Sequence, residues 1–278
     1  ELIINEIEKY ANPNLYHRVF TNSVRYHDTV TKFLKKGLIK IVTSIDAGTD
    51  QTFKIVRGRD KFFNVFENLS KYSKVNPHSV TVKYILTDQN LDENELENFV
   101  LNCIKYNLNN CCFQISMNYK FENLEISLLK SIAFLMGKFK AKGINKFFCD
   151  DHIAARFKKL TAKEKIIIKD YLLKKNIKNI LLDDNGMENL NIFGAGDIAE
   201  NLLNKSSIKE KMNNIEIFDS DPKKIGTLVN GIIIKKPREI LKNNYKIYIS
   251  VAQSYDEIHS SLIKLNVDKK RIVSGLFL

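Results

Sequence analysis

Apolar residues recur with two different spacings along the first 150 residues of the chain. Short runs of consecutive apolar residues are separated by longer stretches in which apolar side chains return every three or four positions. One such stretch places Phe62, Val65, Phe66 and Leu69 on a single stripe. The short runs indicate buried strands, and the longer spacing indicates amphipathic helices.

This pattern predicts strands that alternate with helices in repeating units of about 30 residues. The predicted strands are 14–20, 38–46, 78–86, 111–117 and 144–150. The predicted helices are 2–10, 24–37, 49–58, 60–74, 92–107 and 123–143. Such alternation is typical of parallel α/β folds, and it suits either a partial barrel or an open doubly wound sheet. In both architectures ligands bind at the carboxyl ends of the strands.

The rest of the chain has a different organisation. Residues 151–186 read as a helical connector that ends in the turn "LLDDNG". Residues 187–278 read as a small Rossmann-like domain that opens with a strand, a glycine turn and a helix. The later predicted strands are 213–221, 231–236, 245–252 and 271–275, and the later predicted helices are 237–243 and 254–266. We therefore expect an α/β barrel-like domain at 1–150, a connector, and a second parallel-sheet domain.

Composition removes several classes of function. The net charge of +12 comes from lysines that are spread along the chain, and no zinc-finger, RRM or KH signature accompanies them, so we expect a solvated basic surface and no nucleic-acid partner. No apolar run reaches the length of about 20 residues that spans a bilayer, and no signal peptide is visible. The chain begins with Glu1 instead of Met, which suggests a piece of a longer product.

The four cysteines form no metal-binding pattern. Cys103, Cys111, Cys112 and Cys149 include no Cys-x-x-Cys pair, and no histidine stands at metal-ligand spacing from them. Adjacent Cys111 and Cys112 face opposite ways if they lie in a strand, so they are poorly placed to share a metal. We expect free structural thiols, no metal site and a reducing, cytoplasmic location.

A glycine loop is the clearest binding motif of the second domain. Gly194 and Gly196, with Ala199, match G-x-G-x-x-G/A between a strand and a helix. Asp219 ends the next strand, where a carboxylate accepts hydrogen bonds from ribose hydroxyls. The pattern also fits a plain turn without a ligand, and Asp197 adds negative charge close to the place of a pyrophosphate. The motif does not separate NAD, SAM and a nucleotide sugar, and no Tyr-x-x-x-Lys pair indicates dehydrogenation.

The second domain resembles Rossmann-like modules of bacterial surface-polysaccharide proteins. The matching stretches are "NIFGAGDIAENLL", "IEIFDSDPKKIGTLVNGIIIKKPREIL" and "YISVAQSYDEIHSSLIKLNV". Similar modules form the carboxyl-terminal domain of sugar C-methyltransferases and the amino-terminal domain of sugar-nucleotide acetyltransferases. The resemblance implies a site, with Gly194, Gly196 and Asp219, that faces a nucleotide or nucleotide sugar.

The first domain carries polar turns at the ends of its predicted strands. "TNS" follows the strand at 14–20, and "SIDAGT" follows the run "KIVT", before "FKIVRG" and the strand "VTVKYIL". Ser and Asp at a strand end bind hydroxyl or amino groups, and Arg57 suits a carboxylate. The plainer interpretation makes Asp46 a helix cap and Arg57 a surface charge.

These turns together resemble the middle and late strands of a radical SAM barrel. The resemblance implies that Asn22, Ser44, Asp46 and Arg57 help to hold S-adenosylmethionine, with Lys83 on the following strand as a weaker candidate. It also implies a [4Fe–4S] cluster and radical chemistry on a small molecule. The Cys-x3-Cys-x2-Cys loop of that family is absent from this sequence, so we expect any cluster loop to lie upstream, in the full-length parent.

The sequence thus predicts part of a radical SAM-type protein that acts on a sugar or related metabolite in surface polysaccharide biosynthesis. Its catalytic residues and oligomeric state are not predicted. Two other classes stay open. One is a non-radical methyltransferase or an NAD-dependent sugar-nucleotide enzyme, which needs bound NAD or a base near Tyr255 and His259. The other is a non-catalytic protein that binds a nucleotide sugar.

Overall fold

The computed structural model describes residues 17–118, 124–177, 188–204, 208, 212–251 and 254–273, and the statements below concern these residues. The helix predicted at 2–10, the first residues of the strand at 14–20 and the turn at 181–186 lie outside the described residues. The chain divides into two compact units. Unit 1 comprises Glu1–Cys149 and Ile166–Lys178, and unit 2 comprises Asp150–Lys165 and Asn179–Leu278.

Unit 1 contains a parallel five-stranded sheet in sequential order, which confirms the predicted α/β class. The strands are β1 (His17–Phe20), β2 (Ile39–Ser44), β3 (Val80–Leu86), β4 (Cys112–Met117) and β5 (Phe147–Cys149). They are joined by α2 (Asp28–Lys36), α3 (Asp50–Arg57), α4 (Phe62–Val75), the short 3₁₀ helix η1 (Pro77–Ser79), α5 (Glu93–Lys105) and α6 (Ile126–Ala141).

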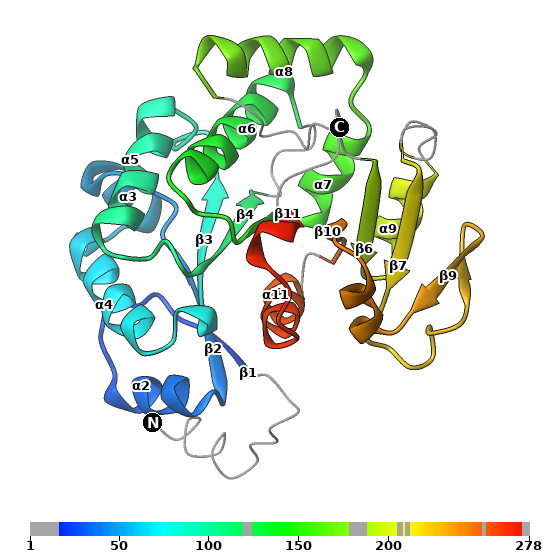
Figure 1. Cartoon of the computed structure of the whole chain (residues 1–278). Helices are drawn as coiled ribbons and strands as arrows, with labels where there is room; N and C mark the ends of the chain where they lie inside the picture. The colour runs from blue at the N-terminus through cyan, green and yellow to red at the C-terminus, as the bar shows by residue number, and fades with distance from the viewer. Residues whose placement is uncertain are drawn as a thin grey trace. The chain divides into compact units, whose positions relative to one another are not determined.

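The strand order places these helices on one face of the sheet. Crossovers between parallel strands are almost always right-handed, so strands added in one direction put every connecting helix on the same side. Figure 1 shows α2 to α6 on one side of strands β1 to β4. This arrangement is that of a partial (βα) barrel, and an open doubly wound sheet would carry helices on both faces. We call the side away from these helices the inner face.

Aromatic side chains fill the layer between the sheet and its helices. Tyr84 of β3 packs against Phe99 of α5 with ring centroids 4.6 Å apart. Phe113 of β4 lies 4.8 Å from Phe139 of α6, and Phe147 of β5 lies 5.5 Å from the same ring. All five rings are almost completely buried, so the helix-facing side chains form the main core of unit 1.

The helix predicted at 24–37 begins later than the sequence pattern indicates. It starts at Asp28, after His27 in extended conformation, and ends on Gly37 with φ 70°. The backbone N–H of His27 donates to the Tyr72 hydroxyl of α4, which holds the entry segment in a non-helical path. The glycine C-cap is as predicted, because only a residue that tolerates positive φ ends the helix in this way.

Unit 2 contains a six-stranded sheet in the order β11-β10-β6-β7-β9-β8. Its elements are β6 (Asn189–Phe193), α9 (Asp197–Leu203), β7 (Asn214–Phe218), β8 (Leu228–Val229), β9 (Ile232–Lys235), the 3₁₀ helix η2 (Pro237–Lys242), β10 (Lys246–Ile249), α11 (Tyr255–Lys264), η3 (Lys269–Arg271) and β11 (Ile272–Val273). All pairs are parallel except β8 with β9. The chain goes from β6 to β7 on one side and later returns to β10 on the other, as in Rossmann folds.

Two local predictions for unit 2 were incomplete. The segment predicted as a helix at 237–243 is a 3₁₀ helix that begins with Pro237 and ends at Lys242. The strand predicted at 231–236 is the second half of a hairpin, whose turn places Asn230 at φ 50° and Gly231 at φ 81°. Two consecutive positive φ values fit a type I′ turn, for which Asn-Gly is the preferred pair.

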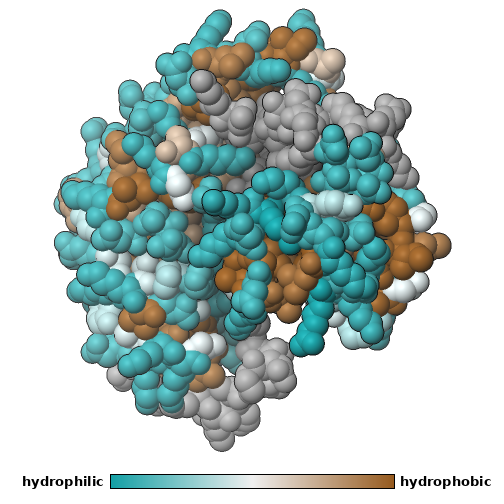
Figure 2. Space-filling model, in the orientation of Figure 1, coloured by the Kyte–Doolittle hydropathy of each residue, from teal (hydrophilic) through white to brown (hydrophobic). Residues whose placement is uncertain are grey.

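The predicted connector is helical where it is described. It contains α7 (Asp151–Lys158) and α8 (Ala162–Lys174), and the two compact units divide it near Ile166. The part of α8 from Ile166 onwards belongs to unit 1, where the Tyr171 hydroxyl donates to Glu93 of α5 at 2.8 Å. Much of the surface in view is hydrophilic, with scattered apolar areas (Figure 2).

Candidate functional site

The turn after β2 is held in a strained conformation at Asp46. This residue has φ 58°, a region that non-glycine residues rarely adopt. Its backbone carbonyl accepts from the Asn90 side chain at 2.9 Å, and its Oδ1 accepts from the backbone N–H of Ile85 at 2.7 Å. These bonds attach the carboxyl end of β2 to the end of β3. Strained residues that are fixed by their surroundings are concentrated at functional sites.

Asp46 forms an ion pair with Arg57 inside this turn. Arg57 Nη1 lies 3.1 Å from Asp46 Oδ2, and Asp46 is 2% exposed whereas the Arg57 side chain is partly exposed. Burial raises the pKa of Asp46 from 3.8 to about 6, and the bond from Ile85 and the charges of Arg57 and Lys83 lower that pKa in part. Arg57 thus has a partner within the chain, and its role toward a ligand carboxylate stays a prediction.

Glu95 of α5 binds the next two residues of the turn. Its Oε1 accepts from the backbone N–H groups of Gly48 and Thr49, the latter at 3.0 Å, and its Oε2 accepts from the Thr49 hydroxyl at 3.0 Å. Asn102, also on α5, donates to the Gly48 carbonyl at 2.9 Å. A Cβ atom at Gly48 would lie 1.9 Å from the Glu95 carbonyl oxygen, so the turn requires glycine here.

Sequence reasoning missed Glu95 and Asn90. Asn90 is completely buried, and its amide nitrogen donates to the carbonyls of both Asp46 and Ile85 at 2.9 Å. The sequence offers only a weak signal for these residues, because Asn90 lies in a polar turn and Glu95 in the acidic first turn of a helix. Their roles depend on the contact between the turn after β2 and the β3–α5 connection.

Asn22 and Ser44 lie at the ends of β1 and β2 as expected. Asn22 is exposed, and its Oδ1 accepts from the Val24 N–H at 3.1 Å within the turn after β1. Ser44 is half-buried and stands opposite Lys83 in the register of β2 and β3. The structure thus brings Ser44, Asp46, Arg57 and Lys83 to the same edge of the sheet.

The residues of this chain do not fit an iron–sulfur cluster. All four cysteines are free and buried, in α5, at the start of β4 and at the end of β5. Burial raises the pKa of the Cys111 thiol to about 12, which disfavours the thiolate that binds iron. Among the described residues no group of three potential metal ligands is present.

The glycine loop of unit 2 lies at the switch point of its sheet. Gly194 follows β6 with φ 104°, and a Cβ atom there would lie 2.3 Å from Val251, which follows β10. Ser250, at the same end of β10, donates its hydroxyl toward the Gly194 carbonyl at 2.5 Å. A Cβ atom at Gly196 would meet no atom within 4 Å, so the space above this residue is open.

Asp219 supports the glycine loop from the end of β7. Its Oδ2 accepts from the Ala195 N–H at 2.8 Å, and its Oδ1 accepts from the Asp221 N–H at 2.9 Å. Lys224 Nζ lies 3.5 Å from Oδ2. Asp219 is 8% exposed and is close to the loop, as the motif predicts, but much of its hydrogen-bonding capacity is used inside the chain.

A family model matches most of unit 2. Residues 186–273 match the model of the family described as "C2185-like, N-terminal". The match covers less than half of the chain. No curated protein matches the sequence.

Solved structures give only weak likenesses. A crystal structure of RSP, a Rex-family repressor, is 14% identical and covers 41% of this chain, with a TM-score of 0.29, and the chain spans 61% of that protein. The structure of RSP in complex with beta-NADH is 15% identical in sequence and has a TM-score of 0.25. The match covers 50% of this chain and 73% of the RSP chain. Likenesses of this size support no conclusion about this chain. No helix in the described ranges is long and apolar enough to cross a membrane.

Proposed function

We propose that this chain is part of a radical SAM-type protein in which unit 2 binds a nucleotide or nucleotide sugar. In this proposal the full-length parent modifies a sugar or related metabolite for a surface polysaccharide. The observation that carries the nucleotide part is the position of the Gly194–Gly196 loop at the switch point between β6 and β10. Ligands of open α/β sheets bind at this position.

The open space above Gly196 supports this reading. A side chain there would not contact the protein, so the glycine is not required by packing within the described residues. A glycine that packing does not need is explained by close approach of a ligand to the backbone. Asp219, beside the loop, has room for few further hydrogen bonds, so we expect it to receive at most one ribose hydroxyl.

The barrel part of the proposal is supported by the topology of unit 1. The sequential sheet with helices on one face is half of a (βα) barrel, whose ligands lie at the carboxyl ends of the strands. S-adenosylmethionine, when bound, supplies a transferable group or a radical precursor. In this chain Ser44 and Lys83 would face it, while Asp46 and Arg57 would fix the turn beneath it.

The alternative of an NAD-dependent enzyme needs an acid or base near the loop. Tyr255 and His259 lie on α11 with ring centroids 6.1 Å apart, and both are buried. This burial does not favour direct contact with a substrate, so we place this alternative second.

Calorimetric titration of the chain tests the nucleotide proposal. We expect binding of UDP- or dTDP-sugars, and weaker or no binding of SAM at unit 2. Replacing Gly196 with valine should abolish that binding, because the side chain would occupy the ligand's approach to the backbone. Folded protein that binds neither nucleotide sugars nor NAD would overturn it. The barrel proposal is tested separately: upstream codons of the gene that encode no Cys-x3-Cys-x2-Cys would exclude active radical chemistry.

A further inference from the structure

The two faces of the unit 1 sheet differ sharply in chemistry. Side chains alternate between faces along a strand, and Tyr84, Phe113 and Phe147 face the helices. The residues between them therefore point to the inner face. Among apolar side chains such as Val42 and Ile85, this face carries polar ones on every strand up to β4: Arg18, Lys40, Ser44, Lys83, Gln114 and Ser116. A parallel sheet with an apolar layer on both faces is apolar throughout its strands. This one is not.

The charge on the inner face is of one sign. None of the five strands contains Asp or Glu, while the inner face carries Arg18, Lys40 and Lys83. Lys146 precedes β5, and its carbonyl accepts the Phe113 N–H, which extends the register so that Lys146 stands beside Cys112. Because Phe147 faces α6, the side chain of Lys146 starts from the inner face.

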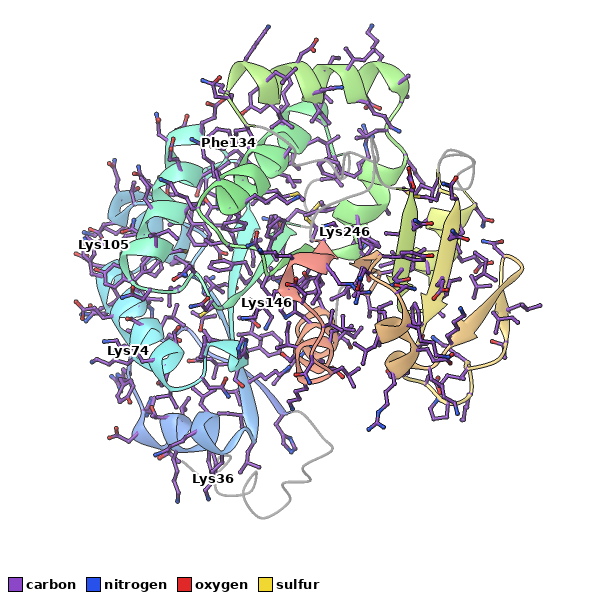
Figure 3. All side chains as sticks on the ribbon, in the orientation of Figure 1. Lys36, Lys74, Lys105, Phe134, Lys146 and Lys246 are labelled. Atoms are coloured by element: carbon purple, nitrogen blue, oxygen red, sulfur yellow. The ribbon has the colours of Figure 1, made fainter. Side chains whose placement is uncertain are left out.

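Two polar groups of this region are buried without a partner. Lys146 is 5% exposed, and its Nζ has no hydrogen-bond partner among the described residues. Ser116 is 1% exposed, and its hydroxyl is likewise unsatisfied within the described part of the chain. Burying an unpaired ammonium group is costly, so such a group indicates a missing counter-charge. In Figure 3 Lys36, Lys74 and Lys105 project from the outer helices of unit 1, whereas Lys146 lies on the other side of the sheet from those helices.

Asp46 does not supply a counter-charge for Lys83. Asp46 is close enough to Lys83 for its charge to lower the Asp46 pKa. Its carboxylate, however, is already bound by Arg57 and by the Ile85 N–H. Lys83 stands in one row with Ser44 and Gln114, which provide hydrogen-bonding groups beside it.

We propose that the inner face binds a phosphorylated small molecule through a diphosphate or two separate phosphates. Lys83 and Lys146 supply the counter-charges, and Ser44, Gln114 and Ser116 supply hydrogen bonds. The two lysines stand two strands apart, on the order of 10 Å across the sheet, a spacing that suits a diphosphate or two phosphates better than a single phosphate. This inference rests on the barrel proposed above and names its substrate class. The substrate is a phosphorylated metabolite or a nucleotide sugar that binds through its diphosphate.

The test uses the full chain and inorganic pyrophosphate, without SAM or nucleotide. We expect calorimetry to detect pyrophosphate binding that weakens with added salt, and inorganic phosphate to bind more weakly. K83M and K146M should each weaken binding about tenfold or more, because each removes a charge-assisted contact. K74M, at an exposed position of α4, is the matched control and should bind as the unaltered chain does.

Thermal unfolding gives a second readout. K146M should fold and be at least as stable as the unaltered chain, because it removes an unpaired buried charge. Pyrophosphate should raise the unfolding temperature of the unaltered chain and leave that of K146M nearly unchanged. Absence of binding, unchanged affinity in K83M and K146M, or an equal loss in K74M would overturn the inference. A parallel titration with UDP-glucose distinguishes the two ligand classes. If the ligand is a nucleotide sugar, K83M should weaken UDP-glucose binding, and if it is a free phosphorylated metabolite, K83M should leave UDP-glucose binding unchanged.

These outcomes are separable from those of the proposed function. Pyrophosphate that binds at the glycine loop of unit 2 would survive both lysine substitutions and so contradict the inference. Nucleotide binding that depends on Gly196 but not on Lys83 would support the nucleotide site, and pyrophosphate binding that still depends on Lys83 and Lys146 would then assign a free phosphorylated metabolite to the inner face.

Discussion

Asp46 and Arg57 are joined by an ion pair across the turn that ends β2, with Nη1 and Oδ2 3.1 Å apart. The pair lies at the carboxyl edge of the sheet, where a barrel binds its ligands. Asp46 is buried and has a positive φ, and its other carboxylate oxygen binds the Ile85 N–H. The ion pair therefore helps to hold the turn at the candidate site in place. The protonation of Asp46 can be followed directly.

Asp46 should titrate about two units above an ordinary aspartate. Because burial raises its folded-state pKa to about 6, the folded chain binds a proton that the unfolded chain, with a pKa near 3.8, releases. Its contribution to stability is therefore most favourable below about pH 4 and is lost as the pH rises through 6. The Asp46 carboxyl carbon, followed by NMR, should show a midpoint near 6, and R57M should raise it further. A midpoint near 4 would contradict the burial of this group.

Gly48 should not accept a side chain. Its Cβ would lie 1.9 Å from the Glu95 carbonyl oxygen and 2.6 Å from the Phe99 nitrogen, both of which are backbone atoms of α5. We expect G48A to lower the free energy of unfolding by about 1–3 kcal/mol or more, as overpacking does. G196A is the matched control, because its Cβ would meet no atom within 4 Å. Equal unfolding midpoints for the two variants in urea would contradict the close contact with α5.

Glu95 should be required as a carboxylate. E95Q keeps the size of the side chain but removes its charge and one of its two acceptor oxygens. An amide oxygen in the place of Oε1 can bind the Gly48 and Thr49 N–H groups only through weaker, uncharged hydrogen bonds, and the Thr49 hydroxyl loses its acceptor at Oε2. The expected cost is about 1–3 kcal/mol. Hydrogen exchange at the Gly48 and Thr49 amides should accelerate in E95Q. In E97Q, which loses the partly exposed pair with Lys138, these amides should exchange as in the unaltered chain. Unchanged exchange in E95Q would remove Glu95 from the frame of the turn.

The sequence predicted the elements of this chain better than the contacts between them. The parallel α/β class follows from apolar periodicity, and the glycine loop follows from its spacing after a strand. The later start of α2 was missed because the hydroxyl of Tyr72, on another helix, fixes the segment before it. The β8–β9 hairpin was missed although its signal, Asn230-Gly231, is present in the sequence.

The residues that hold the turn of the candidate site in place were harder to predict. Ser44, Asp46 and Arg57 are near one another in sequence, so a local motif identified them together. Asn90 and Glu95 reach the same turn from more than 40 residues away, and their bonds to Asp46 and Gly48 depend on how the β3–α5 connection lies against it. A single sequence carries no record of such pairings.

Gly194 and Val251 should show coupled effects on stability. Gly194 has φ 104°, and its Cβ would lie 2.3 Å from a Val251 methyl group, so G194A combines backbone strain with overpacking. V251A removes that methyl group and should recover only the overpacking part in the double variant. The coupling in a double-mutant cycle should be about 0.5–3 kcal/mol. G226A is the control for strain alone, because Gly226 has φ 86° and no atom within 4 Å of its Cβ. Its cost should be smaller than that of G194A/V251A relative to V251A, because Ser250 Oγ, 2.9 Å from the Gly194 Cβ position, stays in the double variant. Purely additive effects of the two substitutions would show that the loop does not pack against Val251.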